Sequence, residues 1–120
     1  MNLEDIQTVQ EMLAAPQQIV IIPHKNPDGD AIGSTLGLWH YLNNRGLSAT
    51  VIAPNDYPKF LKWMPGNEHI LNFERHNSQA KEKLAEATLI FTLDFNHLGR
   101  TGQMEPILES SDAKFIMIDH

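Results

Sequence analysis

Apolar and polar positions follow one another along this chain in a way that predicts strands and helices in alternation. Four short runs are apolar and rich in β-branched residues, which is typical of strands buried on both faces of a parallel sheet. These runs are Gln18–Pro23, Ala49–Ala53, Thr88–Leu93 and Lys114–Ile118, and a shorter strand is expected at Ile70–Phe73.

Between the strands, apolar residues recur every three or four positions, which predicts amphipathic helices. The clearest helix follows a loop at His24–Asp30 and ends near Asn44-Arg45-Gly46, with Gly46 as the residue just beyond it. Further helices are expected at Leu3–Ala14, at Ser78–Glu86 with Ser78 as a cap, and at Met104–Leu108. The alternation predicts an α/β fold, a doubly wound and mostly parallel sheet with helices on both faces.

One long segment, Pro54–Asn67, interrupts this pattern and predicts an irregular loop with a helical turn at Lys59–Met64. Trp63 is expected to pack with Phe60 and Met64 under this loop, with stacking on a nucleic-acid base as the alternative.

Composition narrows the class of protein. The chain has 120 residues, a size suited to one domain, and a net charge of −6, which argues against a long nucleic-acid groove. It has no cysteine, so any metal must be held by His, Asp and Glu. No apolar run approaches the ~20 residues of a membrane span, and the first residues do not resemble a signal peptide, so a cytoplasmic protein is expected.

Polar clusters follow three of the predicted strands directly. They are HKNPDGD at 24–30, Asp94, and the pair Asp119-His120. The carboxyl ends of parallel strands lie at one rim of a sheet, where ligands bind in open α/β folds. In extended backbone Asp28 and Asp30 face the same side, and Gly29 allows a backbone angle that other residues avoid.

Two interpretations of the first cluster compete. Asp28 and Asp30 beside Gly29 suit a turn and a helix cap, which needs no ligand. A cation site accounts better for the three clusters together, because close carboxylates repel unless a cation lies between them. Asp94, between the other clusters, is the natural bridge between two divalent ions. Ligands of mixed oxygen and imidazole type favour Mn²⁺, with Mg²⁺ as the alternative.

The sequence HKNPDGDAIGS at 24–34 resembles the first motif of the DHH phosphoesterases. Asp94 resembles the second motif of that family, and Asp119-His120 begins its Asp-His-His signature. The resemblance extends from about Val20 to His120. It is closest to the branch that degrades very short oligoribonucleotides, an exonuclease activity on RNA, and 3′-phosphoadenosine 5′-phosphate.

The resemblance implies a role for each residue. His24 and Asp28 would hold one Mn²⁺, Asp30 and His120 the other, and Asp94 would bridge them. Among these, Asp30, Asp94 and His120 would act most directly in catalysis. Asp119 would orient a metal ligand, as would Ser34, which follows Gly33 at the start of a helix whose free N–H groups favour an anion. Arg100 is a candidate contact for substrate phosphate, with a surface salt bridge as the alternative.

The resemblance also implies a longer protein. Residues 1–120 would be the N-terminal part of a DHH domain, with the rest of that domain and a C-terminal substrate-binding domain outside them. This part alone is expected to be inactive, and the whole protein could form a homodimer. No membrane partner is expected.

Three alternatives remain. The first is an inorganic pyrophosphatase, although that related family usually carries Thr at the position of Gly29. The second is a non-enzymatic regulatory module whose acidic rim binds one cation, although such modules lack rim histidines like His24. The third is an inert half of a split protein.

The remaining histidines, His40, His69, His76 and His97, are expected in solvent or at the surface.

Overall fold

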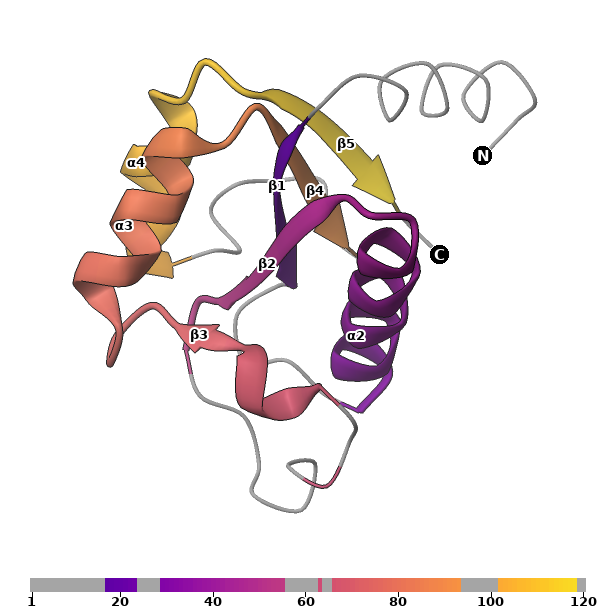
Figure 1. Ribbon diagram of the computed structural model, residues 1–120. Helices are drawn as coiled ribbons and strands as arrows, with labels where there is room; N and C mark the ends of the chain where they lie inside the picture. The colour runs from indigo at the N-terminus through magenta and orange to yellow at the C-terminus, as the bar shows by residue number, and fades with distance from the viewer. Residues whose placement is uncertain (1–16, 24–28, 56–62, 64–65, 94–101, 119–120) are drawn as a thin grey trace.

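The computed structural model describes residues 17–23, 29–55, 63, 66–93 and 102–118. The strands are β1 (Gln18–Pro23), β2 (Ser48–Ala53), β3 (Leu71–Asn72), β4 (Leu89–Leu93) and β5 (Lys114–Ile118). The helices are α2 (Gly29–Asn44), α3 (Asn77–Glu86) and α4 (Glu105–Glu109), with a 3₁₀ helix η2 (Asn67–His69) (Figure 1). No helix in these ranges is long and apolar enough to cross a membrane.

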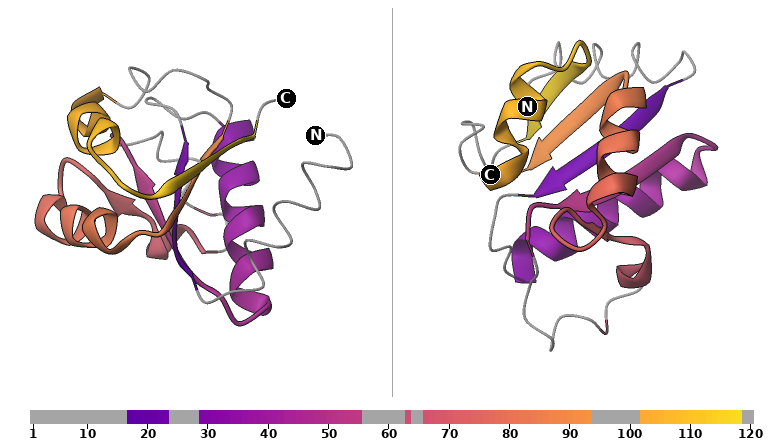
Figure 2. Two further views of the ribbon diagram at one scale, coloured as in Figure 1. Left: turned by 90° about the horizontal axis from the view of Figure 1, so that it is seen from above. Right: turned by 90° about the vertical axis from the view of Figure 1, so that its left-hand side faces the viewer.

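The five strands form one sheet in the order β3-β2-β1-β4-β5. Every pair of neighbours is parallel, so the expected "mostly parallel" sheet is wholly parallel within the described ranges. In Figure 2, α2 covers one face of the sheet, and α3 and α4 cover the other. The predicted α/β, doubly wound fold is confirmed.

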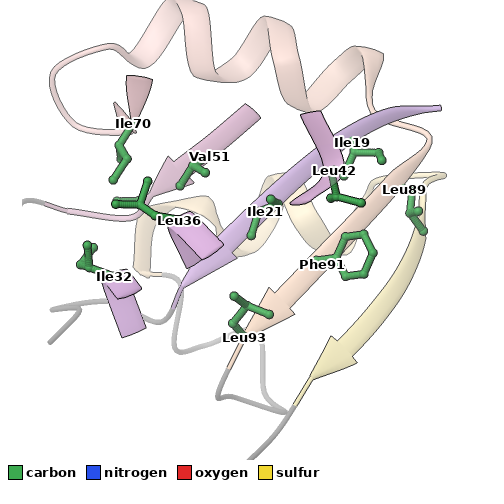
Figure 3. Packing of buried hydrophobic residues seen from close by; sticks show 11 residues of the cluster. Ile19, Ile21, Ile32, Leu36, Leu42, Val51, Ile70, Leu89, Phe91 and Leu93 are labelled. Atoms are coloured by element: carbon green, nitrogen blue, oxygen red, sulfur yellow. The ribbon is translucent and has the colours of Figure 1, made fainter. Parts of the chain in front are cut away.

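The core has two parts because successive side chains of a strand point to opposite faces. On the α2 side, Ile19 and Ile21 of β1 pack with Phe91 of β4 and with apolar residues of α2 (Figure 3). On the other side, Val20 and Ile22 of β1 pack with residues of α3 and α4. Burial on both faces explains why these strands are apolar throughout rather than alternating.

The end of α2 is formed as the sequence predicts. Gly46 has a φ of 78°, which L side chains rarely adopt. Its N–H donates to the carbonyl of Asn43 (3.0 Å), and the N–H of Leu47 donates to the carbonyl of Leu42 (3.1 Å). These two bonds satisfy carbonyls that a helix end leaves unpaired, and they identify Gly46 as the residue that terminates the helix.

The start of α3 differs from the prediction. Ser78 is the second residue of the helix, His76 is at the N-cap, and no side chain caps the helix through a hydrogen bond. Instead, Asn72 Oδ1 accepts the N–H groups of Glu74 (2.9 Å) and Arg75 (3.3 Å) and stabilises the turn before the helix. The turn after β3 therefore determines where α3 begins, and the prediction for Ser78 is wrong.

An aromatic contact packs η2, which follows the long loop in the sequence, against α2. The Trp39 indole N–H donates to the carbonyl of Ala49 (3.0 Å), which fixes the indole between α2 and β2. The ring of His69 stacks on this indole with centroids 5.0 Å apart. Gly66, with a φ of 91°, is buried where an added Cβ would come within 3.1 Å of Trp39 and of His40. Only glycine fits this approach without displacing the indole.

Trp63 corrects another expectation. Its side chain is 74% exposed, so it does not form a small core under the long loop. The helical turn expected at Lys59–Met64 and the helix expected at Leu3–Ala14 lie outside the described residues, apart from Trp63 itself. The short strand β3 and the helix α4 are confirmed, with boundaries one residue from those expected.

Candidate metal centre

Three strands end level with one another at a single rim of the sheet. Pro23, the last residue of β1, pairs in register with Leu93, the last residue of β4. Leu93 in turn pairs with Ile118, the last residue of β5. In the sequence these residues are followed directly by His24, Asp94 and Asp119-His120. Three adjacent strands therefore end at the same level. The next residue in the sequence is a predicted metal ligand after β1 and β4, and the neighbour of one after β5.

This rim includes the point where the strand order reverses. The chain leaves β1 toward α2 on one face and leaves β4 toward α4 on the opposite face (Figure 2). The connections diverge between these neighbouring strands, and open α/β folds bind their ligands at such a point. The ends of β1 and β4 are therefore the candidate position for a bound ligand.

The helix after β1 begins earlier than predicted. Gly29 is the first residue of α2, so Asp30 lies in the first helical turn and not in extended backbone. The extended-chain reason for placing Asp28 and Asp30 on one side is therefore wrong. Since α2 has 16 residues, its first turn offers free N–H groups and a dipole that favour negative charge.

Most of the predicted site lies outside the described residues. This holds for five of the positions named by the motifs and for the candidate phosphate contact: His24, Asp28, Asp94, Asp119, His120 and Arg100. The backbone of Asp30 is placed in α2, and Ser34 lies half-buried one turn further along. Within the part of the chain that is described, no three His, Asp or Glu side chains come together. The assignment of individual metal ligands remains a prediction.

The other described histidines have structural contacts, and each is exposed at the surface as expected. The rings of His40 and Trp39 form a T-shaped pair, and His69 stacks on the Trp39 indole and lies 3.6 Å from a carboxylate oxygen of Glu68. The Nδ1 atom of His76 accepts the backbone N–H of Asn72 (3.0 Å). His97 lies outside the described residues.

Two open hollows occur among the described residues, and neither contains a predicted site residue. One, of about 390 Å³, lies between β3 and α3. The other, of about 310 Å³, lies at the start of α3 and is lined by Arg75–Gln79. Their positions give no reason to move the candidate site away from the ends of β1 and β4.

Thr92 is a residue that the sequence reasoning missed. It lies on β4 one residue before the strand ends, it is fully buried, and its hydroxyl has no hydrogen-bond partner among the described residues. The only other fully buried polar side chain in those ranges, Thr35, donates its hydroxyl to the carbonyl of Ala31 (2.6 Å). The available signal was a hydroxyl inside the apolar run that precedes Asp94, two positions before that residue.

Comparison with known proteins supports the same family. The profile of the DHH family, N-terminal domain, matches residues 18–120. The chain is 38% identical over 92 residues to the bifunctional oligoribonuclease and PAP phosphatase NrnA of Thermus thermophilus, which covers 76% of the chain and 26% of that protein. It is similar in structure, with a TM-score of 0.95 and 43% identity, to an exopolyphosphatase-related protein from Bacteroides fragilis. That match covers 99% of the chain and 35% of the solved structure, so the chain spans about a quarter to a third of each relative.

Proposed function

This chain belongs to the DHH family, and from that premise we propose that its protein is a Mn²⁺-dependent phosphoesterase acting on short oligoribonucleotides and small phosphorylated nucleotides. The observation that carries the proposal is the common level at which β1, β4 and β5 end, with Pro23, Leu93 and Ile118 in register. Each of these residues is followed in the sequence by a motif residue of the family.

The donor set fits two divalent ions. Oxygen and imidazole ligands without sulfur suit Mn²⁺, and the chain contains no cysteine that would favour a softer metal. In this proposal His24 and Asp28 would hold one ion, Asp30 and His120 would hold the other, and Asp94 would be shared between them. When bound, the two ions would supply an activated water and would stabilise the charge that develops on a phosphate ester.

The remaining residues of the rim would position the substrate. The first turn of α2 presents N–H groups to a phosphate oxygen, and Arg100 is a further candidate contact. Asp119 would orient a metal ligand. The net charge of −6 suits a small substrate held by metal ions better than a long nucleic acid held by its backbone.

The nucleotide substrate is supported by the relative that is named an oligoribonuclease and PAP phosphatase. A second candidate substrate, a polyphosphate chain, is favoured by the likeness to the exopolyphosphatase-related protein. Both substrates present a phosphate to the same pair of ions, so the choice depends on parts of the protein that bind the rest of the substrate.

The test uses the full-length protein, stripped of metal with a chelator and then supplied with Mn²⁺ or Mg²⁺. Diadenylate, 3′-phosphoadenosine 5′-phosphate, pyrophosphate and a short polyphosphate are offered in parallel. We expect Mn²⁺ to restore hydrolysis of the two nucleotides. Turnover of pyrophosphate or polyphosphate alone would refute the nucleotide assignment. If no substrate were turned over, the proposal that the protein is a phosphoesterase would be refuted.

His24→Ala tests the metal site in the same assay. We expect hydrolysis to fall by at least about 100-fold, because the loss of groups that merely orient a ligand already costs 10–100-fold. His69→Ala is the matched control, since this exposed histidine stacks on Trp39 away from the strand ends. Equal activity of the two variants would remove His24 from the site and favour a regulatory module.

A further inference from the structure

The strand β5 has one unpaired side. It is the last strand in the order β3-β2-β1-β4-β5, and no strand lies beyond it within the described ranges (Figure 1). The N–H of Lys114 donates to the carbonyl of Thr88, just before β4 (3.1 Å). Successive main-chain groups of a strand point to opposite sides, so Ile116 also faces β4. Phe115 and Met117 therefore direct their N–H and carbonyl groups to the unpaired side.

The side chains of β5 are those of an interior strand. From Phe115 onward every residue of β5 is apolar, yet none of its five positions is buried. The comparable strand β4, which has a neighbour on each side, is buried at every position. Ile116 and Ile118 are partly buried against the core on the α2 side, and Phe115 against the core on the other side. A strand that is apolar on both faces is typical of the interior of a parallel sheet.

The opposite edge of the sheet has the features of a natural edge. Its strand, β3, contains only Leu71 and Asn72, and short edge strands offer little to pair with. The chain then turns at once toward α3, in a turn that the Asn72 side chain stabilises. The β3 edge is therefore complete, whereas β5 lacks both hydrogen-bond partners on one side and apolar cover on both faces.

The chain that follows β5 in the relatives is long enough to supply both. The matching family profile is that of an N-terminal domain, and residues 1–120 span 26% and 35% of the two relatives. A strand that pairs in parallel with β5 needs a crossover of about a dozen residues or more, usually a helix. The strand would satisfy the main chain of β5, and the helix would cover apolar side chains on one face.

A second copy of the protein fits this edge less well. Two β5 strands related by a two-fold axis in one continuous sheet would run antiparallel, whereas every described strand pair is parallel. Such a pairing would also bring no helix to cover the faces of β5. The later part of the same chain is therefore the better occupant.

We propose that the sheet of the whole protein continues past β5. Residues that follow His120 form a right-handed crossover and return as a strand parallel to β5, and the carbonyls of this strand accept the N–H groups of Phe115 and Met117. The β5 strand is then an interior strand, buried like β4. This continuation goes beyond the proposed function and does not depend on which substrate the protein hydrolyses.

Hydrogen exchange of the full-length protein, resolved by residue with NMR, tests this continuation. The amide of Ile116, which faces β4, is the internal reference. We expect the amides of Phe115 and Met117 to exchange within about 10-fold of that reference, because all three are bonded in a ladder. Exchange faster by on the order of 100-fold or more would show an open edge and overturn the inference. Protection that disappears on dilution would assign the edge to a second copy and would also overturn it.

A pair of proline variants of the full-length protein gives an independent measurement. Proline has no N–H, so a strand tolerates it only where that N–H would face solvent. We expect Met117→Pro and Ile116→Pro to lower the melting temperature to a similar extent, and failure of either to fold counts as such a loss. Met117→Leu keeps the N–H and the apolar side chain, and should melt within a few degrees of the unaltered protein. If Met117→Pro also melted there while Ile116→Pro did not, the unpaired side of β5 would be open and the inference wrong.

Discussion

Two glycines with positive φ differ in what surrounds them. Gly46, at 78°, has no atom within 4 Å of the place where a Cβ would be. Gly66, at 91°, faces the Trp39 ring and His40 at 3.1 Å. The first requires glycine for its backbone alone, and the second requires it also for the space that the indole occupies.

This difference gives a prediction at the scale of the residue. Gly46→Ala should destabilise the protein by about 1–2 kcal/mol, the cost of placing an L residue in left-handed backbone. Gly66→Ala should cost at least about 1 kcal/mol more, because overpacking adds to the backbone strain. Urea denaturation of both variants measures the difference. Equal losses would mean that the Trp39 ring moves aside without cost.

The start of α3 shows how one element depends on another. Asn72 lies at the end of β3, and its side-chain oxygen accepts two N–H groups of the turn that leads into the helix. Asn77 adds a bond from its side chain to the carbonyl of Phe73 (3.3 Å). The turn before the helix therefore determines where α3 begins, and Ser78 lies two residues beyond the N-cap position.

A pair of alanine variants tests this difference at the scale of the element. Asn72→Ala should lower the free energy of unfolding by about 1 kcal/mol, the usual cost of losing such a cap or turn acceptor. Ser78→Ala should be neutral or stabilising by a few tenths of a kcal/mol, since alanine is the better helix former. Chemical denaturation decides between them, and a larger loss in Ser78→Ala would restore serine as the cap.

At the scale of the molecule, the two edges of the described sheet are unequal. The edge strand β3 has two residues, while β5 has five, with Met117 51% exposed and Phe115 half-buried. An exposed edge with apolar side chains is a template for pairing with another chain. We therefore expect β5 to be the edge that pairs more readily with another chain.

Residues 1–120 expressed by themselves should accordingly associate as concentration rises. Met117→Lys should reduce the association, because a charged side chain on an edge strand opposes pairing. Gln103→Lys adds the same charge at an exposed position of the short 3₁₀ segment before α4 and should leave the association unchanged. Light scattering over a concentration series measures both. A monomeric unaltered chain at high concentration would refute the expectation.

The order of the elements was accessible from the sequence because it depends on local pattern. β-branched apolar runs gave β1, β2, β4 and β5 within one residue of their observed bounds. The end of α2 followed from Gly46, whose backbone conformation is a local property of glycine. The three polar clusters were also visible, since each directly follows an apolar run.

Tertiary structure decided what the local pattern could not. It placed β4 beside β1 and brought Pro23, Leu93 and Ile118 to one level, through pairings between residues about 70 and 25 positions apart. It also left Trp63 exposed and determined where α3 begins. In the sequence Thr92 is an ordinary β-branched strand residue. Its hydroxyl is unusual only because its register neighbours, Ile22 and Met117, offer no polar partner. Which residues lie beside Thr92 depends on strand pairing between distant parts of the sequence.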